Sequence, residues 1–192
     1  MAAAPRWFTP ANTLTFARLL LALPFALAVR AGSPLAASVV FACAAASDFA
    51  DGRIARRRSE ISALGGFLDH AVDAAFVSLG AAALASVGAL PGALAPLIAV
   101  AFAQYALDSR LMRARGLRGS ALGRWNGIAY YVIVAVPVVR DALGLGWPGP
   151  GLVRGLGWAL VVSTLLSISD RLRRFARARG WCGAGRAVRS PH

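Results

Sequence analysis

Four aspartates between residues 48 and 73 have the chemistry and the spacing of a site for divalent metal ions. Asp48 and Asp51 are three residues apart, and Asp69 and Asp73 are four apart. Residues at these spacings share one face of a helix, so two helices can bring the acidic rows together across a narrow cleft. Mg²⁺ in particular is usually shared between protein carboxylates and substrate phosphates. A pair of such ions would suit the cleavage of a pyrophosphate bond.

A simpler interpretation is that these acids form ion pairs with nearby arginines. Arg56 lies between the two rows and is available for this. Four carboxylates close to hydrocarbon need compensation, because each charge within a membrane costs on the order of 2.5–3.5 kcal/mol. One arginine offsets only part of that charge, and the positions alone leave both interpretations open.

The elements that carry these aspartates are predicted to be membrane helices. The chain of 192 residues is 58% hydrophobic with a mean hydropathy of +0.61, whereas ordinary soluble domains are roughly 45–50% apolar. Apolar runs of about 20 residues are long enough to span a bilayer. Such runs lie at 13–31, 34–54, 67–88, 92–112, 121–139 and 152–169. We therefore predict an all-α, polytopic membrane protein with six transmembrane helices, in which residues 1–192 form a single integral membrane domain.

The distribution of arginine predicts the orientation of these helices. All 21 basic residues are arginines, and with a cytoplasmic N-terminus only Arg30, Arg140 and Arg154 fall on the outer side. This positive-inside pattern places both termini and the acidic rows in the cytoplasm. The net charge of +13 is therefore attributed to topology and not to nucleic-acid binding, and the basic tail at 170–192 is expected to lie against anionic lipid headgroups. If residues 19–31 were instead a cleaved secretory signal, five helices would remain and Arg18 would break the signal pattern.

Read in order, residues 48–73 spell D-x2-D-G-x2-A-R-x8-G-x3-D-x3-D. This pattern resembles the signature of the class I CDP-alcohol phosphatidyltransferase family, with every defining position matched and no departure in spacing. The resemblance implies a phospholipid synthase that transfers the phosphatidyl group of CDP-diacylglycerol to an alcohol and releases CMP. It also implies a homodimer. We expect such an enzyme in the inner membrane of a bacterium.

The same resemblance implies roles for the residues of the motif. Two ions of Mg²⁺ or Mn²⁺ would be bound by Asp48, Asp51 and Asp69, with Asp73 beside them. Asp73 would also act as the general base that takes the proton from the attacking hydroxyl. The pocket for the nucleotide and the CDP-lipid would be formed by Gly52, Ala55, Arg56 and Gly65. Apart from the resemblance, Ser62 lies between the acidic rows, where its hydroxyl either is a weaker contact to the nucleotide or caps the third helix.

Four residues outside the defining positions carry separate expectations. Arg110 and Arg113 are three apart in a basic segment between the fourth and fifth spans, and arginine binds phosphate in a bidentate fashion. These two arginines either only set the topology or bind the phosphate of an acceptor. The second interpretation favours glycerol 3-phosphate or an inositol phosphate over serine or a neutral alcohol. Arg18 could snorkel to the membrane interface or turn toward the acids. His70 is expected to point its ring away from the face shared by Asp69 and Asp73.

A transporter is the alternative function that the acidic rows suggest. Acids within membrane helices often form the path of a cation or a proton. Such a path predicts acids near the middle of the bilayer, whereas these lie at one edge together with Gly52 and Arg56. An aspartate-rich prenyltransferase would also use Mg²⁺, but those enzymes resemble longer chains and lack the D-G-x2-A-R run.

Overall fold

Helices make up nearly all of the chain that the structure describes. The structure is a computed structural model and describes residues 10–58, 63–112 and 121–184; for residues 10–16, 48, 50–58, 63–66, 105–112, 121 and 175–184 it describes the backbone alone. The helices are α1 (Pro10–Arg30), α2 (Pro34–Arg58), α3 (Ala63–Ser86), α4 (Leu94–Met112), α5 (Ala121–Ala142) and α6 (Pro150–Ala184). The predicted all-α fold is confirmed.

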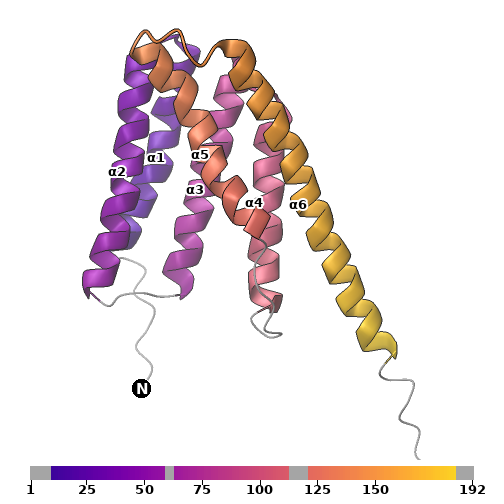
Figure 1. Ribbon diagram of the computed structural model, residues 1–192. Helices are drawn as coiled ribbons and strands as arrows, with labels where there is room; N and C mark the ends of the chain where they lie inside the picture. Colours follow the sequence, from indigo (N-terminus) through magenta and orange to yellow (C-terminus); the bar gives the residue numbers. More distant parts are fainter. Residues whose placement is uncertain (1–9, 59–62, 113–120, 185–192) are drawn as a thin grey trace, which may run out of the picture.

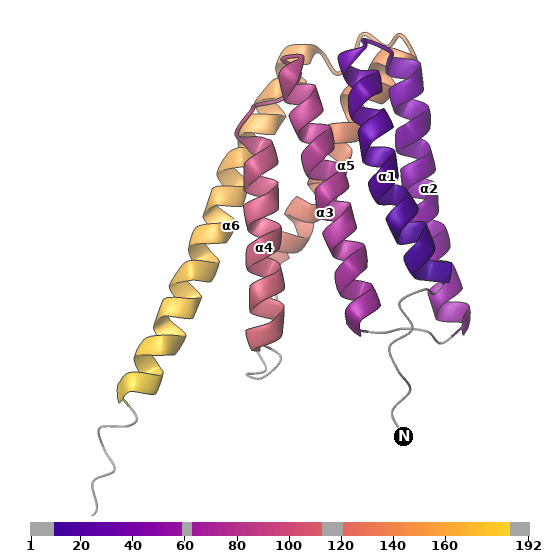
Figure 2. The same cartoon turned by 180° about the vertical axis from the view of Figure 1, so that it is seen from behind.

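The helices run up and down and form one bundle around α3. Helix α3 contacts α1, α4 and α5, while α2 packs on α1 and α5, and α6 packs on α4 and α5. Figure 1 shows the α1–α2, α3–α4 and α5–α6 connections together at one end of the bundle. The start of α1 and the end of α6 lie toward the opposite end, as the reverse view also shows (Figure 2). This arrangement is the one expected for an even number of consecutive spans.

The three connections at that first end use the same turn. Gly32, Gly88 and Gly144 follow α1, α3 and α5 and have positive φ angles of 64°, 76° and 62°. Each turn closes with a backbone hydrogen bond from the residue after the glycine to a carbonyl five residues earlier, as from the Ser33 amide to the Ala28 oxygen at 2.9 Å. This is the Schellman end of a helix, in which glycine adopts the left-handed conformation at no steric cost. Short turns therefore keep neighbouring helices antiparallel.

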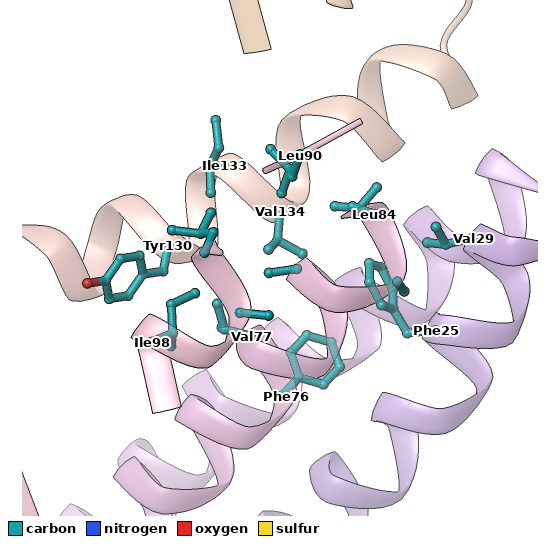
Figure 3. Close-up of a cluster of buried hydrophobic side chains, with 14 of the residues drawn as sticks. Phe25, Val29, Phe76, Val77, Leu84, Leu90, Ile98, Tyr130, Ile133 and Val134 are labelled. Carbon is teal, nitrogen blue, oxygen red and sulfur yellow. The ribbon is translucent and has the colours of Figure 1, made fainter. Parts of the chain in front are cut away.

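Close packing of α1, α3 and α5 makes the centre of the bundle. Phe25 and Phe76 are fully buried, and their ring centroids are 5.6 Å apart. A Cβ atom added to Gly80 would lie 3.0 Å from both Phe25 and Val134, so the absence of a side chain lets three helices approach. Figure 3 shows Phe25, Phe76 and Val134 converging from these helices. The same core fixes the height of α3 relative to α1 and α5, and the acidic residues of α3 lie on its N-terminal half.

The protein is an integral membrane protein with helical spans. Within the described residues, three helical segments are long and apolar enough to cross a bilayer, namely Phe67–Ser86, Leu122–Ala142 and Pro150–Arg174. Two shorter apolar segments, Pro34–Ser47 and Leu94–Gln104, lie in α2 and α4. Many large apolar side chains remain exposed on the outside of the bundle, including Leu20 and Trp158. Lipid can cover such a surface, whereas a soluble monomer rarely exposes contiguous apolar patches of this extent.

Helices α2 and α6 continue past the predicted ends of their spans into polar sequence. Helix α2 continues to Arg58, past the predicted end at residue 54, so Ala55 and Arg56 lie on the same helix as Gly52. Arginine and alanine are good helix formers, and the segment contains no proline to stop the helix. Helix α6 likewise continues from the predicted end at residue 169 to Ala184. The first part of the expected basic tail is therefore a continuation of the last membrane helix.

Candidate active site

The centre of the candidate site is a carboxylate pair on α3. Asp69 and Asp73 are one turn apart, and a single nitrogen of Arg18, Nη1, bridges them. It donates to Oδ1 of Asp69 at 3.0 Å and to Oδ1 of Asp73 at 2.5 Å. The contact joins α1 to α3 across sequence separations of 51 and 55 residues. The predicted shared face of Asp69 and Asp73 is thereby confirmed.

Arg18 forms the closed side of this site. Its residue exposure is 0%, whereas the side chains of Asp69 and Asp73 are 34% and 20% exposed. The Nε of Arg18 also donates to the Ser47 hydroxyl on α2 at 3.4 Å. A buried guanidinium needs such partners, because an unpaired charge in a low-dielectric interior is very costly. Of the two expectations for Arg18, the structure confirms the turn toward the acids.

Tyr131 on α5 completes the described contacts of Asp73. Its hydroxyl donates to the same oxygen, Oδ1, at 2.7 Å. The Tyr131 ring packs edge-on against Phe41 of α2, with 6.3 Å between centroids, and Phe41 in turn contacts Phe76. The aromatic core therefore sets the position of the phenol. Sequence reasoning missed Tyr131, although a tyrosine within an apolar span is a usable signal because its hydroxyl needs a partner there.

The described side chains at this site fit a divalent cation. One oxygen or nitrogen atom each of Asp69, His70 and Asp73 lies within 4.8 Å of the others. This spacing is slightly wider than that between ligands of one metal ion, and small movements of the side chains would close it. Carboxylate oxygens are the ligands that Mg²⁺ prefers, and Mn²⁺ also accepts imidazole. Two carboxylates against one guanidinium leave a negative charge for a cation to neutralise. The residues present therefore fit the metal that the motif implies.

His70 differs from its expected orientation. The residue is exposed, yet one of its ring nitrogens is within reach of the Asp69 and Asp73 oxygens. The prediction that the ring points away is wrong. Positions 70 and 73 are three apart, and residues at this spacing are neighbours on a helix surface. A flexible side chain at position 70 can therefore turn toward the acidic face.

The other predicted site residues lie where the structure describes little or nothing beyond the backbone. The backbone places Asp48, Asp51, Gly52, Ala55 and Arg56 on the last turns of α2, and Gly65 on the first turn of α3. Arg110 is on the last turn of α4. Ser62 and Arg113 lie outside the described residues, as do the side chains of the residues just named. The two helices that carry the acidic rows are thus adjacent in the chain, and α2 ends at the end of the bundle where α3 begins (Figure 1).

A separate set of polar side chains joins α6 to α5 and to α4. The Tyr130 hydroxyl lies 2.6 Å from the Thr164 hydroxyl, and the Ser163 hydroxyl donates to the Asn126 amide oxygen at 2.7 Å. The Gln104 amide donates to the Ile168 carbonyl at 3.3 Å. Polar side chains within membrane helices stabilise helix contacts in this way. These bonds hold α5, and with it Tyr131, against the rest of the bundle.

The geometry brings together parts of both sequence interpretations. Asp69 and Asp73 do form ion pairs with an arginine, as the simpler interpretation requires, but the arginine is Arg18 on α1. The pair also keeps exposed oxygen atoms beside an imidazole, as the metal interpretation requires. A carboxylate pair that is fixed on one side by a buried cation and accessible on the other can hold a metal ion and accept a proton.

Comparison with known proteins identifies the family. Residues 8–169 match the family model of the CDP-alcohol phosphatidyltransferases, and the chain belongs to this family. It is therefore a membrane-embedded transferase of phospholipid biosynthesis, which moves a phosphatidyl-type group from a CDP-linked donor to an alcohol. This membership decides between the enzyme and the transporter in favour of the enzyme.

One relative gives a more detailed comparison. The archaetidylinositol phosphate synthase of Aeropyrum pernix is 31% identical over 152 residues, which covers 74% of this chain and 74% of that protein. The similarity thus extends over most of both chains and well beyond the acidic motif.

Proposed function

We propose that this protein transfers the phosphatidyl group of CDP-diacylglycerol, or of a close relative of that lipid, to a phosphorylated polyol. The observation that carries the proposal is the Asp69–Asp73 pair, which Arg18 and Tyr131 hold in place within the motif of the family. Glycerol 3-phosphate and inositol phosphate are the two favoured acceptors. The lipid product remains in the membrane, and CMP leaves to the aqueous side.

Asp48, Asp51 and Asp69 are the proposed metal ligands, with Asp73 beside them and two ions of Mg²⁺ or Mn²⁺ in the complete site. When bound, such ions neutralise the charge of the diphosphate and stabilise the oxygen of the departing CMP. The described carboxylates and His70 support this role through their donor atoms and their mutual distance. The small residues Gly52, Ala55 and Gly65 would let the nucleotide approach the backbone, and Arg56 and Ser62 would contact its phosphates.

Asp73 is the proposed general base. The acceptor hydroxyl gives its proton to a carboxylate oxygen of Asp73, and its oxygen forms a bond to the phosphorus next to the lipid glycerol. The bond from that phosphorus to the bridging oxygen of the diphosphate breaks, and CMP leaves with this oxygen and the bonding electron pair. Asp73 later releases the proton to water. Because Tyr131 and Arg18 both bind Oδ1, the other oxygen of Asp73 is the one proposed to accept the proton.

The preference for a phosphorylated acceptor rests on arginine and on the relative. Arg110 lies on the last turn of α4, at the end of the bundle where α3 begins (Figure 1), and Arg113 follows it by three residues in the sequence. Arginine forms two parallel hydrogen bonds to a phosphate, so a pair of arginines suits a phosphomonoester. The name of the Aeropyrum pernix relative specifies a lipid with an inositol phosphate headgroup, which favours inositol phosphate.

The proposed setting is a bacterial inner membrane, with six spans, a cytoplasmic active site and both termini in the cytoplasm. The arginine distribution supports this orientation. The antiparallel arrangement of the helices supports an even number of spans (Figure 1). A single domain and a homodimer are part of the same proposal. The extended end of α6 would lie against anionic headgroups on the cytoplasmic surface.

A panel of acceptors tests the reaction and its specificity. Purified protein in lipid nanodiscs is incubated with CDP-diacylglycerol, Mg²⁺ and either glycerol 3-phosphate, inositol phosphate, glycerol, inositol or serine, and CMP release is measured. We expect a phosphorylated polyol to react at least about tenfold faster than its unphosphorylated counterpart, since charge-assisted hydrogen bonds to arginine contribute on the order of 1.5–3 kcal/mol. Faster reaction with serine, or no CMP with any acceptor, would contradict the proposal.

Arginine variants supply the matched control for the acceptor. Arg110→Gln and Arg113→Gln should each raise the KM for the phosphorylated acceptor by about tenfold. Arg118→Gln removes the same charge from a later position of the same basic segment and should leave the KM unchanged. Equal effects of all three variants would mean that the segment acts through its overall charge, and the assignment of Arg110 and Arg113 would be wrong.

A further inference from the structure

Arg18 is a fully buried cation in direct contact with the carboxylates proposed to bind metal. It is 0% exposed and lies on α1, outside the motif that supplies the proposed catalytic groups. One of its nitrogens bridges Asp69 and Asp73, and another contacts Ser47 on α2. Arg18 therefore joins α1, α2 and α3 at one point. Its position raises the question of what the carboxylate pair would do without it.

Two ionised carboxylates one turn apart repel each other in a medium of low dielectric constant. In the metal-bound enzyme, a divalent cation between them would remove this repulsion. Before metal binds, the described positive group in contact with both is Arg18. Since like charges at this spacing destabilise a helix, the pair needs a cation in either state.

The exposure of the three side chains shows that Arg18 and a metal ion would occupy different sides of the pair. Asp69 and Asp73 are 34% and 20% exposed, whereas Arg18 lies entirely inside the bundle. A metal would reach the pair from the accessible side, where His70 also lies. Arg18 would thus remain in place while metal binds, and its positive charge would oppose the charge of the metal.

We propose that Arg18 is a resident counter-cation, a positioning residue that keeps the carboxylate pair assembled in the absence of metal and weakens metal binding by its charge. The inference rests on the metal site of the proposed function. The proposed role of Arg18 differs from that of Tyr131, which binds the same oxygen of Asp73 but carries no charge. Tyr131 orients the carboxylate, so its removal should weaken metal binding, as the loss of partners behind metal ligands generally does.

The test compares four full-length proteins, each purified in nanodiscs with Mg²⁺ and then stripped with EDTA. They are the unaltered protein, Arg18→Gln, Arg18→Lys and Tyr131→Phe. The melting temperature is measured with and without Mg²⁺, and the dissociation constant of Mn²⁺ is measured by electron paramagnetic resonance. Neither readout depends on turnover, so each can be obtained whether or not a variant is active.

We expect the unaltered protein to stay folded in EDTA. Arg18→Gln should lose more thermal stability in EDTA than in Mg²⁺, so that its stabilisation by metal is larger, and it should bind Mn²⁺ about tenfold more tightly because one nearby positive charge is gone. Arg18→Lys retains the charge and should restore both values toward those of the unaltered protein. Tyr131→Phe should bind Mn²⁺ about tenfold more weakly.

Three results would overturn the inference. The unaltered protein could unfold when its metal is removed, Arg18→Gln could lose the same stability with and without metal, or Arg18→Gln could bind Mn²⁺ with unchanged or lower affinity. The first of these is decided without any variant, so the inference can be tested even if Arg18→Gln does not fold. A protein that shows the expected metal responses but releases no CMP would retain this inference and lose the proposed reaction.

Discussion

Replacing Asp73 by asparagine is expected to reduce CMP release by about 10²–10⁴-fold, the range that loss of a general base usually produces. Asparagine keeps an oxygen that can accept the hydrogen bond from Tyr131, and Arg18 keeps its partner Asp69. The variant should therefore remain folded, with a melting temperature no more than about 8 °C lower. Initial rates at saturating donor, acceptor and Mg²⁺, together with a thermal melt, measure both effects.

Asp141→Asn is the matched control for this substitution. Asp141 also pairs with an arginine, Arg140, but at the far end of α5 next to the Gly144 turn. It undergoes the same loss of charge outside the site and should leave the rate unchanged. If the Asp73→Asn variant releases CMP at a rate comparable to that of the unaltered protein, Asp73 is not the base.

The largest expected effect on stability comes from removing both α3 carboxylates that pair with Arg18. The double variant Asp69→Asn, Asp73→Asn removes two ionic partners of a fully buried guanidinium. Breaking a buried ion pair typically costs about 3–5 kcal/mol, because the buried charge that remains has lost its compensation. We expect a loss of this size in the free energy of unfolding, measured by denaturant titration in detergent and followed by the helical circular dichroism signal.

A third substitution shows whether the cost arises from the buried charge. Adding Arg18→Met to the double variant removes that charge and fills a similar volume with an apolar side chain. Replacing a buried ion pair by apolar residues is often neutral or stabilising, so the triple variant should be more stable than the double variant. If the double variant is as stable as the unaltered protein, or if Arg18→Met destabilises it further, the interpretation of Arg18 as a paired buried charge is wrong.

The course of the helices could be predicted closely from sequence because lipid imposes simple requirements. Each predicted span coincides with one helix, and Pro34 and the proline at position 150 begin α2 and α6, as proline at the first helical position commonly does. The largest boundary error concerns α6, which leaves the apolar region. Hydropathy predicts where the apolar segment ends, but a helix can continue into a polar one, as α2 and α6 do.

The carboxylate pair could also be predicted, since spacing on one helix determines which residues share a face. Contacts between different helices could not be predicted in this way. Arg18 and Tyr131 are 55 and 58 residues from Asp73, and which of them meets the pair depends on how α1 and α5 rotate against α3. That rotation is set by packing of Phe25, Phe76 and Val134 around Gly80, and no single-helix pattern contains it.

Metal dependence of CMP release tests the central claim most directly. Purified protein in nanodiscs is given CDP-diacylglycerol and inositol phosphate or glycerol 3-phosphate, and CMP is measured first in EDTA and then after addition of excess Mg²⁺ or Mn²⁺. Mass spectrometry of the lipid fraction identifies the product. We predict no CMP in EDTA, and release of CMP together with the phosphatidyl ester of the acceptor once metal is added. CMP release at the same rate in EDTA, or release without a new lipid, would contradict metal-dependent phosphatidyl transfer at the Asp69–Asp73 pair.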